Sequence, residues 1–393
     1  MLRVLTLSTL FPDAARPNFG IFVQRQTQGL AASPGVDLRV IAPVGLPPFP
    51  LDRLAHYRER AGLPAAELWQ GLEVRRPRFT VVPGTGGRFH AGALVRRLTP
   101  LLNELRTRFP FDVIDAEFFF PDGPAAVALG RRLGVPVSIK ARGADIHHWG
   151  HAGATAAQVI DAGRRADGLL AVSDALRADM AALGIPAEKI AVHRTGIDRT
   201  RFHPRPRAAE KARLGVQGPL VLSVGALIPR KGHDVVIDAV ARLPGITLLI
   251  AGDGPERSAL AARIAAAGIT DRARLLGAVP HDDLPALFAA ADVMALASSS
   301  EGLANAWVEA LASGTPIVIT PAGGAAETVN RAAAGRIADR TPEAFASAIA
   351  EILLAPPDPI EVAAAAQRFS WEANAAQLRD HLTGLVAARA GVG

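Results

Sequence analysis

The chain has 393 residues, of which 49% are hydrophobic and 20% are charged, and its formal net charge is +6. This length and composition predict two globular domains of ordinary size, each with a sizeable core. The chain has no cysteine, which excludes a disulfide scaffold and a cysteine-ligated metal. No uninterrupted apolar run approaches the roughly 18 residues of a transmembrane helix.

The first apolar stretch, Leu2 to Phe11, is short and runs directly into Pro12 and Asp13. Its only basic residue is Arg3, so it lacks the basic region that begins a secretory signal peptide. We interpret it as a first β-strand and expect a cytoplasmic protein.

The positive charge lies in the first half of the chain. Residues 1–200 hold 25 Lys and Arg against 18 Asp and Glu, whereas residues 201–393 hold 18 against 19. Segment 75–108 alone carries eight arginines and one acidic residue, Glu104. This basic flank favours a peripheral position at an anionic membrane surface, or an acceptor that carries phosphate; an ordinary solvated surface is the alternative. Nucleic acid is not expected, because aromatic residues make up only 5% of the chain and offer few stacking platforms.

In the first half, apolar strands alternate with glycine-punctuated turns and helices. The expected strands are residues 2–7, 36–42, 113–116, 135–140 and 168–172, and the expected helices are residues 21–32, 91–108, 123–133 and 175–183. The loop after the first strand of an open α/β sheet lies at the ligand crevice. Asn18 to Gly20, at the end of this loop, are therefore candidates for close backbone approach to a ligand, with a simple tight turn as the alternative.

A second loop at the crevice follows the strand 135–140. It contains Arg142, Gly143 and Asp145, and then two adjacent histidines, His147 and His148. Because adjacent side chains point in different directions, we expect these histidines to be solvated and not to share a metal.

The second half repeats the pattern after a linker rich in Arg and Pro that ends near Pro206. The expected strands are residues 220–224, 246–251, 274–276, 291–297 and 316–320. This rhythm predicts an α/β fold with two Rossmann-like, doubly wound lobes that face each other across a cleft. We place the first lobe at residues 1–200, the second at 201–370 and a last helix at 371–393, and leave open whether that helix packs back onto the first lobe.

Two carboxylates, Glu301 and Glu309, bracket a predicted loop and short helix. They lie eight positions apart, a little over two helical turns, so they cannot act as acid and base on one bond. We interpret them as hydrogen-bond acceptors for two distant parts of an elongated ligand. The backbone amides between them form a candidate anion site, made by Gly302, Leu303, Ala304 and Asn305. A sugar nucleotide fits this arrangement, because it has hydroxyls at both ends and phosphate between them. The alternative is that Glu301 is a helix cap and Glu309 a solvated side chain.

Arg230 and Lys231 lie in the turn after the strand 220–224, next to Gly232. Together with the amides after Glu301, these adjacent cations can hold a diphosphate. No Asp-x-Asp pair occurs in the chain to bring Mg²⁺ to such a group. We therefore expect no metal and no cofactor, and stabilisation of the leaving group by protein cations and dipoles. The alternative is that these two side chains cap the preceding carbonyls or lie in water.

Residues 220–330 contain four motifs, one after another. They are Val224-Gly225 to Arg230-Lys231-Gly232, Gly252-Asp253-Gly254-Pro255, Ser300-Glu301-Gly302 with Glu309 to Pro316, and Gly323-Gly324 to Glu327. In order and spacing this set resembles the donor half of retaining glycosyltransferases of family four. The first half is similar, more loosely, to the subgroup that builds cell-surface polysaccharides, including teichuronic-acid-type enzymes. That likeness rests on Gly20-Ile21-Phe22-Val23, Pro121-Asp122-Gly123, Arg142-Gly143-Ala144-Asp145 and Thr195-Gly196-Ile197-Asp198.

The resemblance implies a GT-B fold whose second lobe binds most of a nucleotide-sugar. It implies that Glu309 binds the ribose and that Glu301 and the following backbone hold the sugar. It implies that Arg230 and Lys231 grip the diphosphate. The other implied site residues are Gly225 and Gly254 for the donor, Gly20 for its phosphates, and Arg142, Gly143 and Asp145 on the sugar or acceptor side. Transfer would proceed with retention, the leaving phosphate oxygen taking the acceptor's proton.

Three positions depart from the family pattern. Many members have arginine where this chain has Ala226, and histidine where it has Arg142 or Glu117. Arg230 can substitute for the missing arginine, whereas the roles of Arg142 and Glu117 are unassigned by the sequence.

The resulting hypothesis is a metal-independent retaining glycosyltransferase that moves a hexose from a nucleotide-sugar to a cell-surface glycan or a lipid-linked acceptor. A dehydrogenase is disfavoured, because the dinucleotide fingerprint that starts at Gly252-Asp253-Gly254 has Arg257 where a third glycine is needed. An epimerase or hydrolase of sugar nucleotides and a non-catalytic nucleotide-sugar sensor stay open as alternatives.

Overall fold

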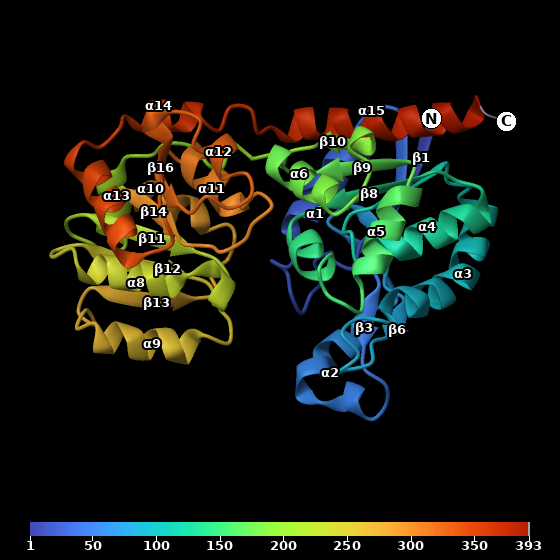
Figure 1. Cartoon of the computed structure of the whole chain (residues 1–393), viewed down its shortest axis with the longest axis horizontal. Coiled ribbons are helices and arrows are strands. Elements are labelled where there is room, and N and C mark those ends of the chain that lie inside the picture. Colours follow the sequence, from blue (N-terminus) through green and yellow to red (C-terminus); the bar gives the residue numbers. More distant parts are fainter. Residues whose placement is uncertain (392–393) are drawn as a thin grey trace. The chain divides into compact units, whose positions relative to one another are not determined.

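The computed structural model describes residues 1–391. The chain forms two compact units, which Figure 1 shows as ribbons. Unit 1 consists of Met1–Gly196 together with the C-terminal segment from Trp371, and unit 2 is Ile197–Ser370. The chain thus leaves unit 1 once and returns to it for its last helix.

Unit 1 is built on an eight-stranded sheet in the order β10-β9-β8-β7-β1-β2-β5-β4. All neighbours are parallel except β4, which is antiparallel to β5. The strands are β1 Leu2–Leu7, β2 Val36–Ile41, β4 Ala66–Trp69, β5 Leu72–Arg75, β7 Val113–Ala116, β8 Val137–Ala141, β9 Gly168–Ala171 and β10 Ile190–Val192. A separate pair, β3 Val44–Leu46 and β6 Arg78–Thr80, is also parallel. Strands β7, β8 and β9 are buried along their whole length, as expected for a parallel sheet covered on both faces.

The helices of unit 1 include the last helix of the chain. They are α1 Ile21–Ala31, η1 Leu51–Arg53, α2 Ala55–Ala61, α3 His90–Arg108, α4 Asp122–Leu133, η2 Asp145–Trp149, α5 Ala156–Arg165, α6 Asp174–Ala182, η3 Ala187–Lys189 and α15 Trp371–Ala390. Helix α15, red in Figure 1, runs along unit 1. It buries Leu378 and Leu382 in the same core cluster as Leu30 of α1. Residues distant in sequence therefore complete the core of this unit.

Unit 2 contains a six-stranded parallel sheet in the order β13-β12-β11-β14-β15-β16. Its strands are β11 Leu220–Val224, β12 Thr247–Ala251, β13 Ala273–Gly277, β14 Val293–Leu296, β15 Ile317–Ile319 and β16 Gly335–Ile337. Its helices are α7 Arg207–Arg213, η4 Pro229–Lys231, α8 His233–Ala241, α9 Arg257–Ala266, α10 Leu284–Ala290, α11 Asn305–Ala312, α12 Ala325–Thr328, η5 Ala332–Ala334, α13 Pro342–Leu354 and α14 Pro359–Ala364. Alternate residues of β11 serve two cores, since Leu220 and Leu222 belong to one cluster and Val221 to the other. The sheet is thus covered on both faces.

The predicted fold class is confirmed, because both units are α/β with doubly wound, mainly parallel sheets. The predicted cap of α6 is also confirmed: the Ser173 hydroxyl accepts the N–H of Leu176 at 3.1 Å. Among the described helices, not one combines the length and the apolar character that crossing a membrane would require.

Candidate active site

In unit 2, two loops meet at the carboxyl edge of the sheet. One follows β11 and the other follows β14, and these strands are neighbours. The N–H of Ser299 donates to the carbonyl of Arg230 at 2.8 Å. Gly232 has φ 66°, and a Cβ there would lie 2.1 Å from the carbonyl oxygen of Ala297. Only glycine fits this left-handed, crowded position, so the loops are pressed together as a Rossmann crevice requires.

The contact between these loops unites three predicted site residues. Lys231 forms an ion pair with one carboxylate oxygen of Glu301, and Arg230 Nη1 lies 3.4 Å from the other. Burial alone would raise the pKa of Glu301, but Lys231 and then Arg230 outweigh it and hold that pKa below its ordinary value. Glu301 is therefore ionised, and the three side chains carry one uncompensated positive charge. This charge gives the cluster an affinity for an anion.

The amides after Glu301 lie at the start of α11. The N–H groups of Leu303, Ala304 and Asn305 donate no hydrogen bond to any other described residue, and no side chain caps α11. The alternative interpretation of Glu301 as a helix cap is therefore wrong. The carbonyl of Gly302 accepts the N–H of Gly324 at 2.8 Å, which holds this loop in place.

Glu309 lies on α11 and meets a partner that the sequence did not indicate. His281 Nε2 is 2.9 Å from Glu309 Oε1, and both side chains are about nine-tenths buried. The His281 ring packs edge-on against Phe202 with ring centroids 5.5 Å apart. One carboxylate oxygen of Glu309 is thus held in place, and no periodic pattern could have revealed the histidine that holds it.

Behind Lys231, the loop after β11 rests on a neutral histidine. His233 Nδ1 is 2.9 Å from the hydroxyl of Ser223, and burial lowers the pKa of His233 to about 4. A Cβ at Gly225 would lie 3.5 Å from Lys231 Cδ and 3.7 Å from His233 Nε2. The lysine stem therefore crosses Gly225 without a second positive charge beneath it. Gly254 supports the same loop, since a Cβ there would lie 2.5 Å from the Leu227 oxygen.

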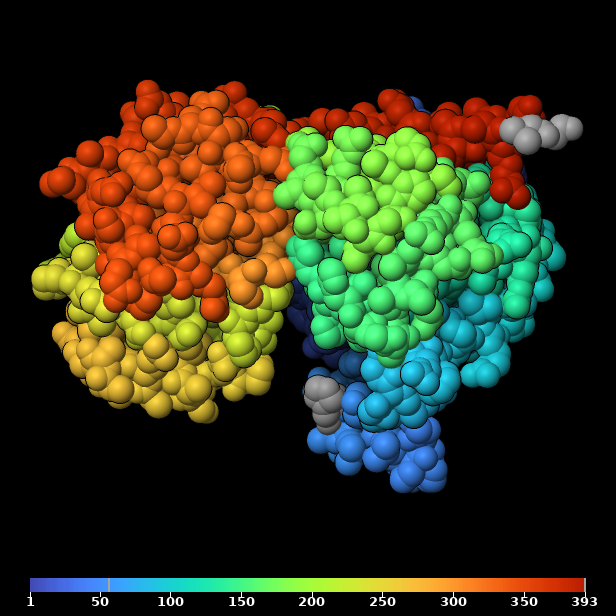
Figure 2. All heavy atoms as spheres, in the orientation of Figure 1, coloured from blue at the N-terminus to red at the C-terminus, as the bar shows by residue number. Residues whose placement is uncertain are grey.

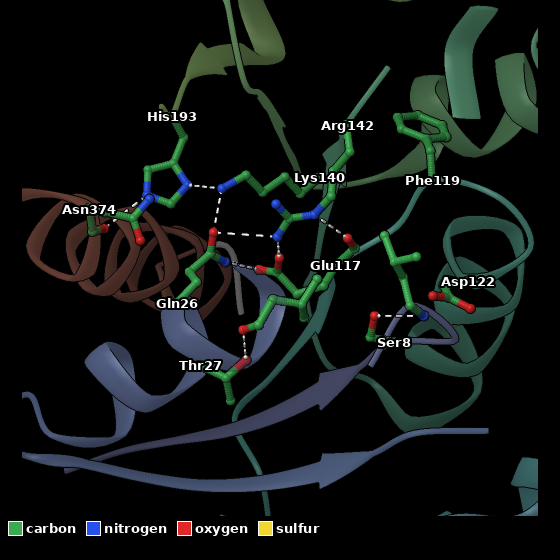
Figure 3. Close-up of polar contacts among 12 residues, drawn as sticks. Ser8, Gln26, Thr27, Glu117, Phe119, Asp122, Lys140, Arg142, His193 and Asn374 are labelled. Atoms are coloured by element: carbon green, nitrogen blue, oxygen red, sulfur yellow. Dashed lines mark hydrogen bonds and ion pairs between the residues drawn. The ribbon is translucent and has the colours of Figure 1, made fainter. Parts of the chain in front are cut away.

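In unit 1, the residues after β7 and β8 form a buried polar cluster (Figure 3). Arg142 donates from Nε to the carbonyl of Glu117 at 2.8 Å and forms an ion pair with the Glu117 carboxylate. Gln26 of α1 donates to the same carboxylate and accepts from Lys140. Two of the three departures from the family pattern, Arg142 and Glu117, are therefore partners of each other. Figure 3 shows the Arg142 and Glu117 side chains directed toward one another.

The cluster continues from Lys140 to α15. Lys140 Nζ lies 2.7 Å from His193 Nδ1, and His193 Nε2 lies 2.8 Å from the carbonyl of Asn374. Burial and the nearby Arg142 lower the pKa of Lys140 to about 7. Burial, followed by Lys140, holds the pKa of His193 well below its ordinary value. The sequence contained one sign of this cluster, a lysine inside the apolar strand β8.

Asp145 and Gly143, predicted to face the sugar or acceptor, are engaged with the protein itself. Asp145 accepts the N–H groups of Phe119, Arg142 and Gly143 at 2.9, 2.9 and 2.8 Å. The carboxylate thus joins the loops after β7 and β8, and Arg142 offers the more accessible polar surface of the three predicted residues. Contact of this loop with a sugar stays a prediction.

Gly20 is the residue before α1 and has φ 72°. A Cβ there would lie 2.0 Å from the carbonyl oxygen of Leu10. The tight turn accounts for glycine at this position, so approach of Gly20 to phosphate stays a prediction.

The two adjacent histidines do not form a shared site. His147 Nε2 lies 2.9 Å from Asp179, whereas the His148 ring packs against Trp149 with centroids 4.8 Å apart. Among the side chains that the structure describes, no group of three His, Cys, Asp or Glu is placed to hold a metal ion.

Asp122 is a buried carboxyl group of unit 1 whose protonation in the folded state can be tested. It begins α4, is fully buried, and accepts the N–H of Thr9 at 2.8 Å. Burial raises its pKa from 3.8 to about 8. The folded protein keeps this proton up to about pH 8 while the unfolded chain releases it near 3.8, so the free energy of unfolding should fall with rising pH in this window, by about 1.4 kcal/mol per pH unit.

Asp122→Asn keeps an oxygen for Thr9 but does not titrate, so the variant should lose this contribution. The measurement is urea unfolding of both proteins at about pH 5 and about pH 7, where the variant should gain on the wild type as pH rises. An equal difference at both pH values would mean that Asp122 is ionised in the folded state.

Comparison with known protein families gives a match for each half of the chain. Residues 20–201 match the family "Glycosyltransferase Family 4", and residues 205–369 match "Glycosyl transferases group 1". The chain belongs to glycosyltransferase family 4. The predicted resemblance is thereby confirmed.

Two relatives of this family 4 chain show how similar its sequence is to those of other glycosyltransferases. A putative teichuronic acid biosynthesis glycosyltransferase of Bacillus subtilis is 28% identical over 365 residues, which are 88% of each chain. A GDP-mannose-dependent alpha-(1-6)-phosphatidylinositol monomannoside mannosyltransferase of Mycobacterium tuberculosis is 34% identical over 239 residues. That match spans 56% of this chain and 62% of the length of the relative.

Solved structures show the same GT-B fold. Sucrose-phosphate synthase from Thermosynechococcus elongatus has a TM-score of 0.82 and 20% identity, with 99% of this chain and 100% of that chain covered. Anabaena HepE in complex with UDP-glucose has a TM-score of 0.75 and 21% identity, with 98% and 100% covered. At this identity the likeness establishes the fold alone.

Proposed function

We propose that the protein is a retaining glycosyltransferase that moves a hexose from a nucleotide-sugar to a cell-surface glycan or a lipid-linked acceptor. The observation that carries the proposal is that Arg230 and Lys231 both contact Glu301. They do so beside the N-terminus of α11, where backbone N–H groups are available to an anion. Both relatives described above are named as glycosyltransferases, and one of them is named for a GDP-mannose donor.

In the proposed reaction, the bond between the sugar C1 and the diphosphate oxygen breaks, and the acceptor oxygen bonds to C1 on the same face. The acceptor's proton passes to the departing phosphate oxygen, so no enzymic base is needed. Arg230, Lys231 and the α11 amides stabilise the charge that develops on the diphosphate. We propose that this protein charge replaces a divalent metal. Glu301 is paired with Lys231 in the structure. When Lys231 turns toward the phosphate, Glu301 would accept hydrogen bonds from the hydroxyls of the sugar.

The acceptor side of the proposal rests on unit 1. Arg142 is fixed by Glu117 and by the ring of Phe22, whose centroid lies 4.8 Å from the guanidinium carbon. We propose that it contacts the transferred sugar or the acceptor. The exposed arginines of segment 75–108, Arg88, Arg96, Arg97 and Arg108, would attract an anionic membrane surface. Arg76 of the same segment is 1% exposed and takes no part in this.

Thermal denaturation with UDP-, GDP- and ADP-sugars tests the donor, because a bound ligand raises the melting temperature. Incubation with an acceptor and NMR of the product then tests transfer and retention of the anomeric configuration. Release of free nucleotide without acceptor would indicate a hydrolase, and donor binding without any turnover would indicate a sensor. Loss of activity under chelation would contradict metal independence.

Replacing Glu309 with alanine should weaken binding of the donor identified by thermal denaturation about tenfold or more, because a charge-assisted contact to the ribose is lost. The kcat at saturating donor should change little, since this contact is equal in the ground and transition states. Isothermal titration calorimetry and steady-state kinetics measure the two effects. Glu343→Ala, which removes an exposed carboxylate paired with Arg242, is the matched control, and unaltered donor affinity in Glu309→Ala would refute the ribose assignment.

A further inference from the structure

A pocket lies in unit 1, at the carboxyl end of β5. Its volume is about 380 Å³. It is lined by Leu63, Ala65, Ala66, Arg75, Arg76, Pro77, Arg78, Arg97 and Leu101. Four arginines thus line the pocket beside apolar side chains, and the lining contains no acidic side chain. Figure 2 shows this part of unit 1, between residues 44 and 108, in blue to cyan.

Two of the arginines form the walls of the pocket. Arg76 is 1% exposed, donates to the carbonyl of Pro12 at 2.8 Å and forms an ion pair with Glu67. Arg78 donates to the carbonyl of Arg76 at 2.7 Å and also to that of Leu63. These contacts hold both positive charges in place whether or not a ligand is bound.

The other two arginines keep donors available. Arg97 donates from Nε to the carbonyl of Arg78 at 3.1 Å, and its two terminal nitrogens have no partner among the side chains and backbone groups that the structure describes. Within the described part of the chain, Arg75 has only a distant ion pair, 3.9 Å from the exposed Glu104. Arg75 and Arg97 can therefore each present a fork of N–H groups to the pocket.

The charge in the pocket is not balanced. Four guanidinium groups stand against two nearby carboxylates, those of Glu67 and Glu104. Burial, and after it the electrostatic repulsion from Arg76, lowers the pKa of Arg78. An anion in the pocket would relieve this repulsion.

We propose that this pocket binds a phosphate group that carries an apolar substituent. Guanidinium forks match phosphate oxygens in bidentate geometry, and Leu63 and Leu101 supply an apolar surface for the substituent. The phosphate could belong to a soluble phosphoester or to a lipid headgroup, which share this chemistry.

The position of the pocket suits an acceptor that extends along unit 1. Strands β5 and β8 are four steps apart in the sheet, about 19 Å at the usual spacing of parallel strands. A ligand whose phosphate lies between Arg75 and Arg97 could therefore place its other end near Arg142, at the same edge of the same sheet. This assignment of the ligand as acceptor rests on the proposed function, whereas binding of phosphate does not.

The test compares Arg75→Gln, Arg97→Gln and the double variant with Arg96→Gln. Arg96 is an exposed neighbour on α3 outside the pocket lining, so its loss removes the same charge from the same helix. The soluble probe is hexyl phosphate, with inorganic phosphate for comparison, titrated by calorimetry without nucleotide. The lipid probe is phosphatidylcholine vesicles with and without phosphatidic acid, measured by co-sedimentation.

Wild type and Arg96→Gln should bind hexyl phosphate alike, and both should prefer it over inorganic phosphate. Each pocket variant should lose about tenfold in affinity and the double variant about 100-fold. Binding of hexyl phosphate would identify a soluble phosphoester as sufficient, and binding of phosphatidic acid vesicles alone would identify a headgroup. Equal losses in Arg96→Gln and Arg97→Gln, or no binding of either probe, would overturn the proposal. Because no nucleotide is present, neither result depends on the glycosyltransferase activity.

Discussion

Replacing Lys231 with alanine should lower kcat about 10²-fold or more, because the variant loses a contact to the charge that develops on the leaving diphosphate. Arg230→Ala should have an effect of the same order. Since the contact strengthens in the transition state, kcat should fall more than donor affinity does. Steady-state kinetics with the donor found by thermal denaturation would measure both parameters.

The two variants also separate catalysis from folding. Lys231 is mostly buried and neutralises Glu301, so its loss also leaves a buried carboxylate with one partner fewer. The Arg230 side chain is 35% exposed, and its removal should leave the melting temperature nearly unchanged. Arg242→Ala removes an exposed arginine on the same unit and serves as the control for net charge. Near-normal turnover in both site variants would remove the basis of the proposed mechanism.

Replacing Glu117 with alanine should lower the free energy of unfolding of unit 1 by about 3–5 kcal/mol, the usual result of removing one member of a buried ion pair. Glu117 is fully buried and faces Arg142 and Gln26, which in turn contacts Lys140. Its loss leaves the buried Arg142 guanidinium without its carboxylate. Urea unfolding followed by a signal from unit 1 would measure the change.

A mutant cycle tests whether the pair itself is responsible. Arg142→Met alone should also be destabilising, and the double variant Glu117→Ala with Arg142→Met should be more stable than the sum of the single effects predicts, because no unpaired guanidinium is left. Glu104→Ala, which removes a 61% exposed carboxylate 3.9 Å from Arg75, should change stability by less than about 1 kcal/mol. Strictly additive single effects would show that Glu117 and Arg142 do not stabilise each other.

Local sequence was sufficient to predict the elements at the candidate donor site. The apolar runs of β11, β12 and β14 and the glycine turns after them carry their signal within a few residues, since strand periodicity and turn chemistry are local. The juxtaposition of Arg230 and Lys231 with Glu301 followed from one topological rule, that loops after neighbouring parallel strands share an edge of the sheet. The region from Gly45 to Gly71 was not resolved by these rules, because β3, α2 and β4 are short and β3 pairs with the distant β6.

The partners within each site were beyond local inference. His281 contacts Glu309 and His193 contacts Lys140 across 28 and 53 positions of sequence. A lysine within an apolar strand was visible in the sequence, but its role depends on Gln26 from α1. The grouping of Arg75, Arg76, Arg78 and Arg97 around one pocket likewise requires α3 to pack beside β6.

The sequence by itself determined that the chain forms two Rossmann-like lobes and carries cations and carboxylates in the loops that follow their strands, because periodicity and turn residues act over short distances. Only the tertiary structure decided how those charges are balanced: Lys231 by Glu301, Arg142 by Glu117, and the pocket arginines incompletely. Charge balance depends on distance in space and on burial, and neither is set by the spacing of residues along the chain.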